Sequence, residues 1–238
     1  MTKLDQLSSE DIAARLSGSP EERAALIREG AEAGLAEAQA VYGQMLLDAQ
    51  QPAEAFGWFW KAAQQGHPMG LNMLGRCYDL GWGTRVDKVR AAECFRVAAE
   101  GGLDWGMYNY GSALALGQGL TANKAEALGW FQKAAAMGHA KSKNFVGSFH
   151  EDGELLPRDM AAAADLYAQA AEGGDFRGMF NHARMLAEAG DTDGALLWIG
   201  RCGETATPGF RDKALAWLAQ VPDTRLRTEG LAALKKGY

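Results

Sequence analysis

The chain has 238 residues, 47% of them hydrophobic, which suffices for the core of one large domain or two ordinary ones. Its 24 basic and 30 acidic residues give a net charge of -6, the wrong sign for a protein that wraps phosphate backbones, and this argues against nucleic acid as the partner. Abundant alanine and only 6 prolines favour helices over sheet, so we expect an all-α protein.

The first 34 residues hold two short helical segments, 11–16 and 20–33, which we expect to form a capping pair with a polar outer face. The opening stretch MTKLDQLSSEDIAARL has no apolar core of the kind found in secretion signals. No uninterrupted apolar run approaches the ~20 residues that span a bilayer. We therefore expect a cytoplasmic protein without membrane insertion.

A repeat occupies the middle of the chain. The stretch GWFWKAAQQGH at 57–67 returns as GWFQKAAAMGH at 129–139. Between and beyond them, glycines recur 36 residues apart, at Gly66, Gly102, Gly138 and Gly174. An aromatic residue keeps the same spacing, at Phe59, Phe95, Phe131 and Tyr167. A fixed period of this length predicts stacked helix pairs, whose binding function resides on a surface.

Each full repeat is predicted to contain two helices. In the repeat that begins near residue 68, Leu71, Leu74 and Tyr78 form one apolar stripe of the first helix. Gly81 should end that helix, because glycine adopts the left-handed conformation readily, and Gly83 permits a tight turn. An Asp or Asn that can cap the second helix follows, at Asp87, Asn123 and Asp159.

The repeat columns divide the chain into seven predicted parts. The first and fifth repeats are shorter, because the segments DAQQPAE and EAGDTDGA lack the glycine loop. The parts are an N-terminal capping pair at 1–34, repeats at 35–67, 68–103, 104–139, 140–175 and 176–206, and C-terminal capping helices at 207–238.

The pattern LGxxYxxGxG at 74–83, with Asp87 after it and WFxKAAxxGH at 130–139, resembles the Sel1-like repeat family, a relative of the tetratricopeptide repeats. The resemblance implies a right-handed α/α superhelix, a solenoid that acts as an adaptor in signalling or complex assembly. The secreted branch of the family pairs cysteines through each repeat. This chain has only Cys77, Cys94 and Cys202, without CxxC spacing, so we expect buried thiols in a reducing compartment instead.

In a right-handed stack of such pairs, the first helix of each repeat lines the concave side, so we expect the partner to bind there. The candidate residues are Asn72, Arg76, Trp105, Tyr108, Asn109, Lys141, Asn144, Arg177, Asn181 and Arg184. An asparagine amide offers a donor and an acceptor to the main chain of an extended peptide. The cations suit a carboxylate, and the aromatic pair supplies anchors. The alternative is that the asparagines and arginines bond to neighbouring helices and hold the superhelical pitch.

Four histidines are the other candidates for chemistry. His67 and His139 follow a helix-ending glycine, so we expect them at helix termini. His150 and His182 occupy columns held elsewhere by a tyrosine and a leucine, so both should be partly buried. A metal site with Glu151 or Cys202 is conceivable, but a hydrogen-bonded core histidine fits better, and we predict no metal or cofactor.

No nucleophile motif or HExxH is present, and the GWG and GQG turns follow a helix rather than a strand, unlike nucleotide loops. The sequence therefore predicts a non-enzymatic scaffold, a monomer or weak dimer, that binds a protein or extended peptide, acidic or with a free carboxylate, in its concave groove. The alternative is an accessory subunit that buries Trp60 or Trp82 of the outer face against a specific enzyme. Some bacterial relatives resemble companions of iron-dependent oxygenases or iron-uptake systems. An enzyme is the third class.

Overall fold

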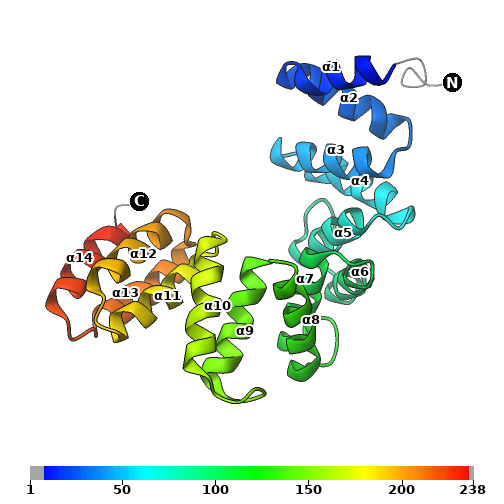
Figure 1. Cartoon of the computed structure of the whole chain (residues 1–238). Helices are drawn as coiled ribbons and strands as arrows, with labels where there is room; N and C mark the ends of the chain where they lie inside the picture. The colour runs from blue at the N-terminus through cyan, green and yellow to red at the C-terminus, as the bar shows by residue number, and fades with distance from the viewer. Residues whose placement is uncertain (1–7, 236–238) are drawn as a thin grey trace. The chain divides into compact units, whose positions relative to one another are not determined.

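The computed structural model describes residues 8–235, and within that range all regular structure is α-helical (Figure 1). The all-α repeat fold predicted from the sequence is confirmed. The helices are α1 (Ser9–Ser17), α2 (Pro20–Glu32), α3 (Ala36–Asp48), α4 (Pro52–Gln64), α5 (Pro68–Leu80), α6 (Lys88–Glu100), α7 (Asp104–Leu116), α8 (Lys124–Ala136), α9 (Ala140–Asp152), α10 (Met160–Glu172), α11 (Phe176–Glu188), α12 (Thr192–Thr205), α13 (Pro208–Leu218) and α14 (Thr224–Lys235).

The turns inside the full repeats are built as the sequence predicted. Gly81 ends α5 with φ 77°, and its N–H donates to the Cys77 carbonyl. Gly117 and Gly153 end α7 and α9 in the same left-handed conformation. Asp87 caps α6 by accepting a hydrogen bond from the N–H of Arg90. Asn123 and Asp159 cap α8 and α10 through their Oδ1 atoms. These caps fix where each second helix begins.

The second glycine of the first two turns lies against the preceding repeat. Gly83 has φ 69° and Gly119 has φ 76°, a region that side chains other than glycine rarely adopt. A Cβ at Gly83 would overlap the Pro52 carbonyl at the start of α4, and one at Gly119 would overlap the Lys88 carbonyl at the start of α6. Each turn therefore packs on the first turn of the previous second helix, which explains the GxG spacing.

The aromatic column forms the core between paired helices. Phe59 and Phe131 are fully buried, and Phe95 and Tyr167 are nearly so. A glycine of the first helix makes room for the ring, because a Cβ at Gly75 would lie 2.6 Å from the Phe95 ring. Gly43 and Gly147 stand in the same relation to Phe59 and Tyr167. The close approach removes large apolar surface from water at each repeat.

The chain forms two compact units, Met1–Ala127 and Leu128–Tyr238, and α8 begins in one and ends in the other. The first unit contains α1 to α7, and the second contains α9 to α14. At the end of the second unit, Leu218, Leu226 and Leu234 of α13 and α14 close an apolar cluster over Ile199 of α12. Residues 1–7 and 236–238 of the predicted caps lie outside the described residues.

The three cysteines are present as thiols. Cys77 and Cys202 are fully buried, and burial raises the pKa of each thiol to about 12. Burial likewise raises the pKa of Cys94 to about 11. Thiols with such pKa values stay protonated at neutral pH and are weak nucleophiles. Over residues 8–235, no helix combines the length and apolarity that a membrane crossing requires.

Candidate functional site

The first helices of the repeats, α3, α5 and α7 in one unit and α9 and α11 in the other, carry every predicted binding residue. We call the surface they present the A-helix face and describe it separately for each unit. In the first unit it contains Asn72 and Arg76 of α5 and Trp105, Tyr108 and Asn109 of α7. In the second it contains Lys141 and Asn144 of α9 and Arg177, Asn181 and Arg184 of α11.

Arg76 is the charged group of the first unit's A-helix face. Its guanidinium carbon lies 4.6 Å from the centre of the Trp82 ring, in the turn after α5. No carboxylate within residues 8–235 forms an ion pair with Arg76, and burial lowers the pKa of its guanidinium. The stacked ring holds one face of the guanidinium and leaves its N–H edge for hydrogen bonds. Trp82, which the sequence had suggested for the outer face, instead packs on an A-helix residue.

Asn72 does not offer its amide to solvent, because it is only 2% exposed. Its Oδ1 accepts a hydrogen bond from Asn109 Nδ2 of the next A helix at 2.8 Å. In the second unit, Asn144 is buried in the same way and accepts from Asn181 Nδ2 at 2.8 Å. The four asparagines therefore form two pairs between consecutive A helices. This differs from the predicted ladder of exposed amides and matches the alternative in which they hold neighbouring helices together.

Trp105 and Tyr108 form an aromatic pair on α7. Their ring centres lie 6.1 Å apart with the planes at 88°, an edge-to-face contact. Trp105 is 39% exposed, whereas Tyr108 is half-buried. An indole that leaves more than a third of its surface in water retains apolar area that a partner can cover, so Trp105 remains an anchor candidate.

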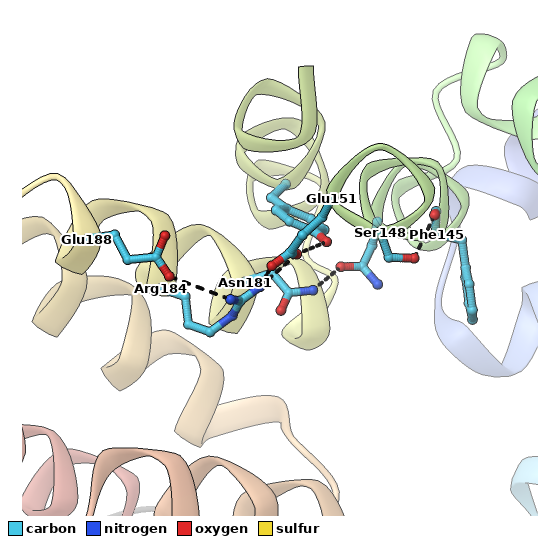
Figure 2. Close-up of polar contacts among 8 residues, drawn as sticks. Phe145, Ser148, Glu151, Asn181, Arg184 and Glu188 are labelled. Carbon is cyan, nitrogen blue, oxygen red and sulfur yellow. Dashed lines mark hydrogen bonds and ion pairs between the residues drawn. The ribbon is translucent and has the colours of Figure 1, made fainter. Parts of the chain in front are cut away.

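Arg184 of the second unit lies in a closed polar network (Figure 2). Its Nη2 donates to both Glu151 carboxylate oxygens at 2.8 Å, and Glu188 lies 3.7 Å away. Tyr167 donates its hydroxyl to Glu151 at 2.6 Å. Burial alone would raise the pKa of Glu151, but the hydrogen bonds from Tyr167 and Arg184 lower it. The Glu151 carboxylate thus neutralises the charge of Arg184. In place of the predicted contact with a partner, Arg184 takes part in a polar network that joins α9, α10 and α11.

Arg177 and Lys141 lie at the beginnings of α11 and α9. The Arg177 guanidinium carbon is 4.6 Å from the Phe176 ring centre and 5.7 Å from that of Phe210, and no ion pair involves it within residues 8–235. Both cations act on Asp175, the buried N-cap of α11. Burial raises the pKa of Asp175, and the two cations oppose that shift. Arg177 therefore packs on two aromatic rings and supports the N-cap of α11 electrostatically.

The histidines have structural positions. His67 and His139 cap α5 and α9 by accepting hydrogen bonds from the N–H groups of Gly70 and Ser142, as expected for residues at helix termini. His150 and His182 are partly buried, as predicted. The expectation that they are fully hydrogen-bonded is wrong at Nδ1, which has no partner within residues 8–235 in either ring. In the described part of the chain, no group of three or more His, Cys, Asp or Glu residues could hold a metal ion.

Two partners that shape the site were missed by the sequence reasoning. Trp82 had been considered only for the outer face, and Glu151 had been considered as a metal ligand. A signal for the Glu151 pairing exists, because Glu151 and Arg184 carry opposite charges on consecutive A helices, 33 residues apart in a 36-residue repeat. The spacing of the asparagines is a signal for their pairing. Asn72 and Asn109, which are bonded, are 37 residues apart, whereas Asn109 and Asn144, which belong to different bonded pairs, are 35 apart, so the four do not occupy one position of the repeat.

Comparison with protein-family models places Sel1 repeats at residues 36–67, 68–103, 106–139 and 140–175, which together make up more than half of the chain. The chain belongs to the Sel1 repeat family. Sel1 repeats are typically non-catalytic scaffolds, and repeats of this kind generally mediate protein–protein interaction. No curated protein matches this Sel1 repeat chain significantly.

Solved structures show the same fold. A protective antigen of uropathogenic Escherichia coli with an SLR fold is 27% identical with a TM-score of 0.68, covering 96% of this chain and 52% of the antigen. A Sel1 repeat protein from Oxalobacter formigenes is 25% identical with a TM-score of 0.70, covering 92% of this chain and 66% of its own. The Sel1 repeat chain thus spans about half of the antigen's length and about two thirds of the Oxalobacter protein's.

Proposed function

We propose that the chain is a non-enzymatic cytoplasmic adaptor that captures a protein or extended peptide on its A-helix face, and that the bound segment is acidic or ends in a free carboxylate. The observation that carries the proposal is Arg76. Its guanidinium lies over the Trp82 ring at 4.6 Å and forms no ion pair within residues 8–235, and Asp79 attracts it only at longer range. A partly desolvated cation without a counter-ion gains more from a ligand carboxylate than an exposed one does.

The neighbouring helix supports an adjacent apolar subsite. Trp105 of α7 is 39% exposed, and Tyr108 meets it edge to face. The hydrogen bond between Asn109 and Asn72 links α7 to α5, so the aromatic pair and Arg76 belong to helices that are joined directly. A ligand with a carboxylate next to a large apolar side chain matches these two features.

The proposal is tested with a library of extended peptides, each made with a free acid and with an amidated C-terminus. Arg76→Gln should lower the affinity for acidic and free-acid peptides by about tenfold or more and abolish the preference for the free acid. Trp105→Ala should weaken both forms equally, because it removes an apolar contact. Isothermal titration calorimetry measures both effects.

The control is Arg201→Gln, which removes an arginine that also stacks on a tryptophan, Trp198, at 4.7 Å but lies on α12. It should leave peptide affinity unchanged. The proposal is abandoned if Arg76→Gln and Arg201→Gln behave alike, or if the wild-type chain binds no member of the library.

An accessory subunit that docks onto a specific enzyme is the second candidate. Trp60 supports it, because its indole is 42% exposed and belongs to α4, the second helix of its repeat. On this alternative, Trp60→Ala would release the enzyme from the chain, and Arg76→Gln would not. Co-purification of the enzyme with each variant separates the two functions.

A further inference from the structure

The turns after α5 and α7 carry apolar side chains that leave about half or more of their surface in water. Leu80 ends α5, Val86 lies in the turn, Val89 is the second residue of α6, and Leu116 ends α7. We call these four residues the loop-edge patch. Leu116 and Val89 are 68% and 66% exposed, the two largest exposures among the big apolar residues of the described chain. The other two leave about half of their surface in water.

The four residues belong to two turns that both lie at the start of α6. Leu80 and Val86 flank a turn that is closed by a hydrogen bond from the Asp87 N–H to the Tyr78 carbonyl at 2.9 Å. The turn after Leu116 packs on the start of α6, since a Cβ at Gly119 would lie 2.7 Å from the Val89 nitrogen. Two consecutive turns thus bring their apolar side chains to the beginning of the same helix.

The third full repeat shows that these side chains are dispensable for the turn itself. Gly153 ends α9 with φ 70°, and the Asp159 N–H closes the turn on the His150 carbonyl at 3.1 Å. At the column of Leu80 and Leu116 this repeat has Asp152, and at the column of Val86 it has Arg158. The same turn therefore forms with charged residues at these positions. Apolar residues retained in water at two repeats need another explanation, and an interaction surface supplies one.

The charge around the first of the two turns favours an acidic partner. Residues 79–90 contain three basic and two acidic residues, a net charge of +1 within a chain of net charge -6. Arg85 is exposed, and no ion pair involves it within residues 8–235. Arg90 is paired only loosely with Asp87, at 3.4 Å, with 66% of its side chain exposed. Carboxylates alternating with apolar side chains would complement both features.

We propose that the loop-edge patch docks an acidic amphipathic helix of another protein, on a surface at the turns that does not include Arg76, Trp105 or Tyr108 of the proposed function. The apolar face of that helix covers Val89 and Leu116, and its carboxylates meet Arg85 and Arg90. The proposed docking of a helix on the loop-edge patch is independent of peptide binding at Arg76, because the two surfaces share no residue.

The test uses the full chain and a fluorescein-labelled synthetic helix, roughly 18 residues long, with leucines on one face and glutamates on the other. Anisotropy should show salt-sensitive binding to the wild-type chain. The double substitution Val89→Ser and Leu116→Ser should weaken binding by about tenfold or more, and so should Arg85→Glu. Since these side chains are exposed, the melting temperature of each variant should match the wild type, which excludes unfolding as the cause.

Two kinds of control make the result specific. Leu197→Ser removes a leucine of α12 that is 55% exposed, and Lys213→Glu reverses the charge of an exposed lysine of α13; both should leave binding unchanged. A helix with glutamine in place of glutamate should bind more weakly, and a scrambled sequence of the same composition should not bind. Absence of binding to the wild type, or equal affinity for all variants, overturns the proposal. So does a wild-type dimer that the Val89 and Leu116 double substitution converts to a monomer, because a second copy would then occupy the patch.

Discussion

Arg76 and Arg184 occupy the same column of the repeat and have different surroundings. Arg184 meets Glu151 of the preceding A helix, with both carboxylate oxygens at 2.8 Å. The residue that corresponds to Glu151 in front of Arg76 is Leu47, which offers no charge. Arg76 packs on Trp82 instead. One side chain on the preceding A helix therefore distinguishes the arginine of this column that is ion-paired from the one that is not.

At the same scale, Glu151→Gln tests the closed network. The substitution removes the charge that accepts bonds from Arg184 and Tyr167 and leaves Arg184 partly buried beside a neutral amide. We expect a loss of about 1–3 kcal/mol in the free energy of unfolding at pH 7. The folded pKa of Glu151 is lowered, so its contribution is complete above its ordinary pKa of about 4.3 and is lost as pH falls through the folded pKa.

The difference between wild type and Glu151→Gln should therefore shrink in acid, as urea denaturation at a series of pH values would measure. Glu188→Gln is the control, because Glu188 is 60% exposed and 3.7 Å from Arg184, so its loss should cost less than about 0.5 kcal/mol. A stability difference that stays constant down to pH 3 would show that the charge of Glu151 is not what matters.

At the scale of the element, the helix pair depends on the second glycine of its turn. In Gly119→Ala, an alanine would have to adopt φ 76°, which residues with a Cβ rarely do. Its Cβ would also overlap the Lys88 backbone, which cannot move without disturbing α6. We expect a loss of about 2–4 kcal/mol in the free energy of unfolding. Gly129→Ala is the matched substitution, since Gly129 lies inside α8 with no atom near its missing Cβ. It should raise stability by about 0.5–1 kcal/mol.

Thermal and urea unfolding, followed by helical circular dichroism, compare the two variants. Equal effects of the two substitutions would mean that the contact between the turn and α6 contributes nothing. A stabilising Gly119→Ala would show that the left-handed conformation at residue 119 is not required.

At the scale of the whole molecule, the sequence predicted what the period determines. Helix ends at Gly81 and caps at Asp87 follow from local backbone chemistry, which repeats with the columns, and the structure confirms them. The residue types at one position of the repeat do not predict which side chains are buried between neighbouring helices. Asn72 and Asn109 sit in register with an exposed face, yet they bond to each other, because consecutive A helices approach closely enough for their amides to meet. Whether a side chain forms a hydrogen bond or ion pair depends on the residues that the adjacent repeat places beside it, and the repeat pattern at one position does not include those residues.

The same reasoning predicts how the molecule loses structure. In a repeat array each helix pair contacts mainly its neighbours, so a local defect should open nearby helices without opening distant ones. Gly119→Ala should speed amide hydrogen exchange in α6 and α7 and leave α11 and α12 unchanged. Glu151→Gln should speed it in α9, α10 and α11 and leave α6 and α7 unchanged. Mass spectrometry of exchanged peptides resolves the helices separately. If either substitution accelerated exchange uniformly from α2 to α14, the chain would unfold as one cooperative body, and stability would have to be assigned to the whole array rather than to neighbouring pairs.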